Sequence, residues 1–169
     1  MESLGIRIYG DEVLRRRTPD VEELDEDLAG FLERMVETMI VEEGVGLAAP
    51  QVGVSRRIAV VNPEPGNPGT LLHLINPRII SSGDRSESVE EGCLSVPGIR
   101  GRVERPAAIE VEYLDPEGAE HREAFEGLVA RIIQHEVDHL DGVLFVDRLS
   151  FGRRTMVKGR LRELARRGK

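Results

Sequence analysis

The order of apolar and polar side chains predicts three helices. Apolar residues recur every three or four positions over residues 25–42, which is typical of an amphipathic helix. Residues 128–140 are apolar over much of their length and predict a largely buried helix that ends near Asp141 and Gly142. A basic stretch over residues 153–167 predicts the last helix.

Between the first two helices the pattern predicts short strands. Residues 115–118 (Asp-Pro-Glu-Gly) predict a turn between two strands of a hairpin. Pro50 cannot lie in a helix interior or a central strand, so we expect the segment 44–51 to be irregular. Because the strands gather in the middle of the chain and do not alternate with helices, the predicted fold class is α+β. The expected strands are residues 57–61, 71–75, 86–89, 107–114 and 120–126.

Length and composition suit a globular protein. With 169 residues, 40% hydrophobic and 32% charged, the chain is expected to form a single domain over residues 1–169. Its apolar runs fall short of the roughly 20 residues that span a bilayer, and its start lacks the pattern of a secretory signal. The lone Cys93 excludes an internal disulfide and favours a reducing compartment. We therefore expect a cytoplasmic protein without a membrane partner.

The net charge of −8 is unevenly distributed. Residues 151–169 carry eight basic side chains and one acidic one, whereas the rest of the chain holds 15 basic and 30 acidic side chains. The acidic body would repel nucleic acid, so no DNA partner is expected, but the basic C-terminal helix could contact RNA. The alternative is a solvated helix whose charge balances an acidic body.

A metal-binding pattern lies inside the second predicted helix. His135 and His139 are four positions apart and Glu136 follows the first, which is an H-E-x-x-H sequence. At about 100° per residue the two histidines share one helix face, so their imidazoles can hold one divalent ion. Glu136 lies beside that face, where its carboxylate can take a proton from a water that the metal activates. We therefore predict a metal-dependent hydrolase of an amide-type bond, against the alternative of two histidines that only pack.

A catalytic ion needs a third protein ligand and an open position. Downstream of the motif the candidates are Asp141 and Asp147, because no His or Cys follows His139. Upstream stands Cys93, between Gly92 and Pro97. A lone cysteine is often only a small buried hydrophobe. A thiolate with two imidazoles is nevertheless a sound ligand set for zinc, iron, nickel or cobalt.

Three segments together resemble the signature motifs of the peptide deformylase family: residues 44–51 (GVGLAAPQ), 91–95 (EGCLS) and 134–139 (QHEVDH). The short interval between the first two, and the helical tail after the third, resemble the family's first type. The resemblance implies a hydrolase that removes the N-formyl group from the formyl-methionine of nascent polypeptides and releases formate. It also implies mostly antiparallel sheets packed around a central metal-binding helix, with N-terminal and C-terminal helices.

The resemblance implies a role for each matching residue. Cys93, His135 and His139 would hold one divalent metal ion, which is usually Fe²⁺ in the cell, while Zn²⁺, Ni²⁺ or Co²⁺ can occupy the purified protein. Glu136 would be the general base and then the acid that protonates the leaving amine. Gln51, through its side chain, and Leu94, through its backbone N–H, would stabilise the oxyanion. Substrate contacts are expected from Val45, Gly46, Gly92, Arg100 and Leu128.

Two charged residues near the motifs leave alternatives open. Arg131 either lines the methionine pocket with its aliphatic stem or is a surface residue. Glu91 is expected to hold the loop before Cys93 through an ion pair with Arg102 or Arg105.

Three other functions compete with deformylation. A general zinc peptidase would share the H-E-x-x-H helix but would need a downstream ligand and an open cleft. A binding protein with a structural metal would need four protein ligands, and only three candidates are evident. A cysteine–histidine hydrolase would not need this helix.

Overall fold

The computed structural model describes residues 3–168, and within them the three predicted helices are confirmed. They are α1 (Glu26–Val41), α2 (Gly127–Leu140) and α3 (Phe151–Arg167). Asp25 begins α1 because its side chain accepts a hydrogen bond from the Leu28 N–H at 2.8 Å. Gly142, with a φ of 76°, directly follows the last turn of α2 and its cap, as the sequence predicted. None of the helices in residues 3–168 is long and apolar enough to cross a membrane.

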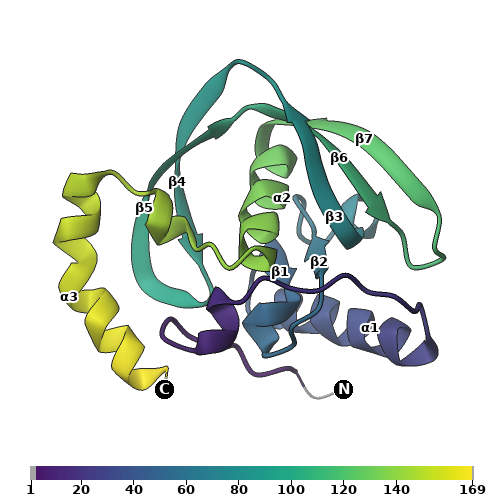
Figure 1. Ribbon diagram of the computed structural model, residues 1–169, viewed down its shortest axis with the longest axis horizontal. Helices are drawn as coiled ribbons and strands as arrows, with labels where there is room; N and C mark the ends of the chain where they lie inside the picture. The colour runs from purple at the N-terminus through teal and green to yellow at the C-terminus, as the bar shows by residue number, and fades with distance from the viewer. Residues whose placement is uncertain (1–2, 169) are drawn as a thin grey trace.

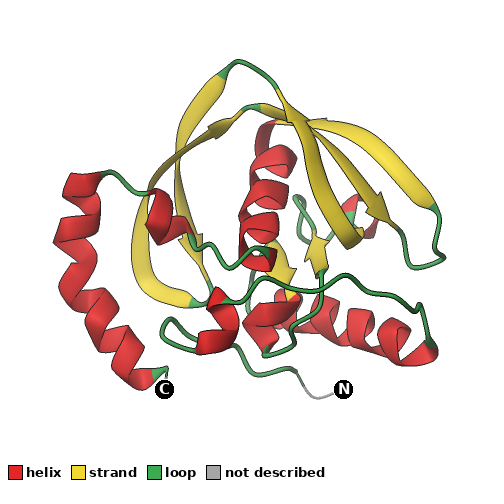
Figure 2. Ribbon diagram, viewed as in Figure 1, coloured by secondary structure: helices red, strands yellow, loops and turns green. Residues whose placement is uncertain are grey.

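The strands form two antiparallel sheets, which confirms the α+β class. One sheet has the order β1-β2-β3-β6-β7 and the other pairs β4 with β5. The two sheets arch over α2 from opposite sides, α1 lies beneath, and α3 lies outside β5 (Figure 1; Figure 2). The strands are β1 (Gly46–Ala48), β2 (Ile58–Val61), β3 (Leu72–Ser82), β4 (Ser86–Cys93), β5 (Val96–Pro106), β6 (Ala108–Leu114) and β7 (Glu120–Glu126).

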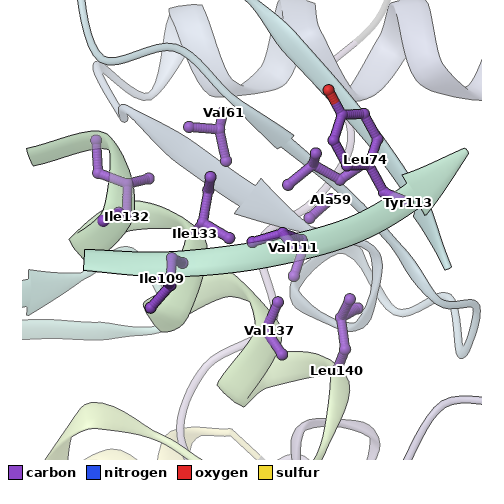
Figure 3. Packing of buried hydrophobic residues seen from close by; sticks show 12 residues of the cluster. Ala59, Val61, Leu74, Ile109, Val111, Tyr113, Ile132, Ile133, Val137 and Leu140 are labelled. Carbon is purple, nitrogen blue, oxygen red and sulfur yellow. The ribbon is translucent and has the colours of Figure 1, made fainter. Parts of the chain in front are cut away.

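Helix α2 is held by its apolar face. Ile133, Val137 and Leu140 lie one turn apart on α2 and pack against the five-stranded sheet, where Val61 and Val111 meet them (Figure 3). Each of these aliphatic side chains contributes about 1.5–3 kcal/mol when it is fully buried. The helix therefore has one orientation, with its histidines facing away from this cluster and toward β4.

The basic C-terminal helix is an integral part of the fold. Val157, Leu161 and Leu164 of α3 are buried in a cluster that also contains Val103 of β5 and Phe145. Phe145 belongs to a short 3-10 helix, η4 (Phe145–Arg148), that links α2 to α3. The basic side chains lie on the other faces of α3, so this helix both covers a core and presents positive charge.

Several strands differ from the prediction in length. The pattern predicted that β3 ends at residue 75, but the strand continues to Ser82. Pro77 is tolerated because it lies at a β-bulge, where the strand pairing needs no N–H from it. Asn76, with a φ of 53°, makes this bulge and exchanges two hydrogen bonds with the Val21 backbone. β4 likewise extends beyond residue 89, to Cys93.

Two further strands were not predicted. β5 was missed because its buried positions include Gly101 and Arg105 and so do not alternate as apolar and polar. The segment 44–51 was predicted to be irregular, which is wrong: it holds β1 and most of the 3-10 helix η2 (Ala49–Val52). Pro50 lies in the first turn of η2, outside β1, where neither the helix nor the sheet needs a hydrogen bond from its missing N–H.

Candidate active site

The three predicted metal ligands come together. His135 and His139 project from α2 toward Cys93, which ends β4, and the Cys93 Sγ lies 3.2 Å from the His139 Nε2. The ligand atoms of the three residues lie within 4.8 Å of one another. This donor set of one thiolate and two imidazoles fits a borderline divalent metal.

The downstream alternatives for the third ligand lie elsewhere. Asp141 accepts a hydrogen bond from Arg57 at 2.8 Å, and Asp147 accepts one from Arg15 at 2.6 Å. Neither belongs to a ligand cluster among the described residues. The upstream cysteine is therefore the third member of the site.

Glu136 lies beside the ligands and is almost fully buried. Its side chain is buried, and its Oε2 has no hydrogen-bond partner among residues 3–168. Burial raises the pKa of the Glu136 carboxyl to about 7. A Cβ atom on Gly46 would lie 2.6 Å from the Glu136 Oε1, so only glycine lets β1 approach this carboxylate so closely.

The Gln51 side chain is oriented by its own neighbours. Its Oε1 accepts a hydrogen bond from the Ala48 N–H at 2.9 Å, which directs the Nε2 toward Ser95 and Cys93. The Nε2 lies 3.2 Å from the Ser95 Oγ and 3.5 Å from the Cys93 Sγ. An amide N–H is thereby held at the metal ligands. Ser95 was not predicted as a site residue, although its place at the end of the segment 91–95 (EGCLS) was an available signal.

A cleft of about 540 Å³ runs past these groups. Almost all of the predicted site residues line it; His139 is the exception and is buried beneath Cys93. Gly92 lies under Arg100, since a Cβ there would meet the Arg100 Nη1 at 2.7 Å. The predicted residues in its wall are Val45, Gly46, Gln51, Gly92, Cys93, Leu94, Arg100, Leu128, His135 and Glu136.

Glu91 is the anchor of the site. Its Oε1 accepts a hydrogen bond from the His135 Nδ1 at 2.9 Å, which leaves the His135 Nε2 for the metal. Arg105 binds both carboxylate oxygens at 2.6 and 2.9 Å, so of the two arginines predicted as partners it is Arg105 that pairs with Glu91. Arg102 instead donates to the Ser88 carbonyl at 2.7 Å.

Arg131 is neither a surface residue nor only a pocket wall. It is buried, and its Nη1 donates to Glu91 at 2.6 Å and to the Val103 carbonyl at 2.9 Å. Asp138, which was not predicted as a site residue, completes the network by accepting from Arg105 at 2.8 Å. Its place between Glu136 and His139 in the H-E-x-x-H motif could have identified Asp138 as a site residue from the sequence.

This network determines the charge of Glu91. Burial alone would raise the pKa of its carboxyl, but hydrogen bonds from His135 and Arg105 and the charge of Arg105 outweigh burial and hold that pKa well below its usual range. Glu91 is therefore a carboxylate at neutral pH, bound by groups from β5 and α2.

Fold and site together define a metal-dependent hydrolase with a Cys-His-His ligand set and a buried glutamate. The family model described as Polypeptide deformylase matches residues 3–155. A peptide deformylase of Thermotoga maritima is 45% identical over 161 residues, covering 95% of this chain and 96% of the relative. One of Picosynechococcus is 46% identical over 86% of this chain and 79% of its own length. The chain belongs to the peptide deformylase family.

Solved structures agree with this assignment. The crystal structure of the Thermotoga maritima peptide deformylase is similar with a TM-score of 0.84 and 46% identity, over 89% of this chain and 99% of that one. The Plasmodium falciparum enzyme is similar with a TM-score of 0.92 and 39% identity, over 96% of this chain and 95% of that one. The expected antiparallel sheets around a central helix are thus the fold of the family.

Because Glu91 is buried among arginines and Glu90 is exposed, replacing Glu91 should lower the free energy of unfolding far more than replacing Glu90. Glu91→Gln should lower the free energy of unfolding by about 3–5 kcal/mol, because it leaves buried arginines without their anion. Glu90→Gln, which removes an exposed partner of Arg100, should change it by less than about 1 kcal/mol. Urea unfolding of both variants measures the two values, and equal shifts would contradict the anchoring role.

Proposed function

We propose how the residues of this site carry out the reaction of the family. The chain is an enzyme that removes the N-formyl group from nascent polypeptides, and it uses a divalent metal. The buried Glu136 beside three convergent metal ligands is the observation that supports our assignment of roles. We further propose that the chain acts as one catalytic domain, and that it does so in the cytoplasm, where its lone Cys93 stays reduced and formyl-methionyl chains are made.

Glu136 moves the proton. Cys93, His135 and His139 would hold the divalent ion, which would supply Lewis acidity to the reaction. Glu136 accepts the proton of the attacking water as the new C–O bond forms at the formyl carbon. It then delivers that proton to the methionine nitrogen as the C–N bond breaks, which yields formate and a free amino terminus.

Gln51 and Leu94 stabilise the negative charge that develops on the formyl oxygen. The Gln51 amide is already oriented by Ala48 and Ser95, so its N–H need not reorganise during the reaction. Leu94 follows Cys93 directly and lines the cleft, which supports a contribution from its backbone N–H.

The substrate backbone lies along β1. This strand is at the edge of its sheet, so one side of it is open to an added strand, with Gly92 across the cleft. Val45 and Leu128 are 37% and 60% exposed and line the cleft, and together with Gly46 they form the site for the methionine side chain. Arg100 contacts the chain beyond methionine.

Replacing Glu136 should separate metal binding from turnover. Glu136→Ala should keep about one metal per chain and lose roughly 10²–10⁴-fold in kcat, because the proton carrier is gone. Cys93→Ala should lose the metal as well as the activity. Metal analysis and hydrolysis of formyl-Met-Ala-Ser measure both properties. Wild-type turnover by Glu136→Ala would contradict the role, and cleavage of unformylated peptides would indicate a general peptidase.

We propose Fe²⁺ as the native metal, on the basis of the family resemblance. The protein purified without oxygen should contain about one iron per chain, and its activity should fall in air as the ion oxidises. Metal analysis before and after exposure to air tests this. One zinc per chain with full, air-stable activity would contradict it.

We also propose that the exposed basic face of α3 contacts ribosomal RNA. Truncation after Ser150 would expose the core beneath α3, so charge reversal is the cleaner change. The triple variant Lys158→Glu, Arg162→Glu, Arg166→Glu should co-sediment less with ribosomes than wild type and show a shallower salt dependence.

The matched control reverses three exposed arginines of the body, Arg17, Arg34 and Arg85, and so changes the net charge equally. Equal binding by the two triple variants would contradict a specific contact by α3.

A further inference from the structure

A second groove opens beside the active-site cleft. It has a volume of about 560 Å³, and it shares Glu90 and Arg100 with the cleft. Alternate residues of β5 face it, because side chains two positions apart lie on one face of a strand. The opposite wall comes from η4 and the start of α3. Its charged lining consists of Arg100, Arg102, Arg148, Arg153, Glu90 and Glu104.

Two of these arginines have no carboxylate partner among residues 3–168. Arg102 donates to the Ser88 carbonyl at 2.7 Å and to its Oγ at 3.4 Å. Arg153 donates twice to the Arg100 carbonyl, at 2.6 and 3.1 Å. Both guanidiniums are thus held in place by neutral oxygens. Each has five N–H donors and keeps some of them for an anion.

The other two arginines of the groove already have carboxylate partners, whereas Glu104 has no ion pair among residues 3–168. Arg100 binds Glu90 at 3.0 Å, and Arg148 binds both oxygens of Asp138 at 2.6 and 2.8 Å. The unpaired charges of the groove are therefore Arg102, Arg153 and Glu104, which leaves an excess of one positive charge within a body whose net charge is negative.

The groove adjoins the end of the cleft at which Glu90 and Arg100 lie. Glu90 and Ser88 precede Cys93 on β4 by three and five positions, which is about 10 and 17 Å at the rise of a strand. An extended peptide whose formyl group lies at Cys93 covers that distance in about three to five residues.

We infer that this groove binds an acidic side chain of the substrate, about three to five residues after formyl-methionine, through Arg102 and Arg153. The inference rests on the proposed function, because it deepens the substrate class of the same site. A single carboxylate fits two free guanidiniums. A polyanion such as RNA would also meet Glu90 and Glu104 in the groove and the acidic body around it.

The test compares amidated peptides that begin formyl-Met-Ala and carry Asp, Asn or Lys at the third, fourth or fifth position after methionine, with Ser or Gly elsewhere. At low salt the wild-type holoenzyme should show about five-fold higher kcat/KM for Asp than for Lys at one of these positions, mainly through KM. The difference should fall below about two-fold at 0.5 M NaCl, where surface ion pairs are screened.

Reversing one charge should reverse the preference. Arg102→Glu should favour Lys over Asp at the same position, and this ratio does not depend on the overall activity of the variant. Arg34→Glu changes the net charge equally at an exposed site on α1 and should keep the preference for Asp.

Three outcomes would contradict either the role of the groove or the proposed function. Equal rates for Asp, Asn and Lys, with normal hydrolysis of formyl-Met-Ala-Ser amide, would contradict binding of an acidic side chain in the groove and leave the proposed function intact. No hydrolysis of any formyl peptide by the wild-type enzyme would overturn the proposed function. Binding of a single-stranded RNA oligonucleotide that Arg102→Glu abolishes, without any preference for Asp, would assign the groove to RNA.

Discussion

One buried carboxylate joins the parts of this enzyme. Glu91 comes from β4, and its partners Arg105, Arg131 and His135 come from β5 and α2. Separating these elements would leave buried charges unpaired, at a cost of several kcal/mol. Because the same carboxylate holds the His135 Nδ1, the interaction that fastens the small sheet to the helix also orients a metal ligand.

The chemistry of the site depends on close approach as well as on charge. Gly46 brings β1 against Glu136, and Gln51 follows in the next turn of the chain, where Ala48 and Ser95 hold its amide. Glu136 is thereby enclosed with few hydrogen-bond donors around it, and its raised pKa is a consequence of that enclosure. A buried carboxylate, three convergent metal-binding side chains and an oriented amide are thus provided by three segments that are distant in sequence.

The C-terminal helix α3 has an apolar face that packs into the core and a basic face that is exposed. The sequence left open whether its basic residues contact RNA or balance an acidic body, and its arginines obscured the apolar spacing. Val157, Leu161 and Leu164 pack into the fold, and Arg153 ties the start of the helix to β5. The positive charge of this helix is therefore presented by a fixed surface, one edge of which forms a wall of the groove beside the active site.

The sequence by itself determined the helices, the α+β class and the shared helix face of His135 and His139, because helical periodicity and H-E-x-x-H spacing are local properties. Cys93 was only one of three candidates for the third ligand until the family resemblance favoured it. It did not determine β5, whose buried face carries Arg105, nor the partners of Glu91. A charged residue is buried only when distant segments neutralise it, and no local pattern records which segments those are. The tertiary structure decided that Arg131 is an internal anchor and that Arg102 faces a groove, because both depend on which strand lies beside which helix.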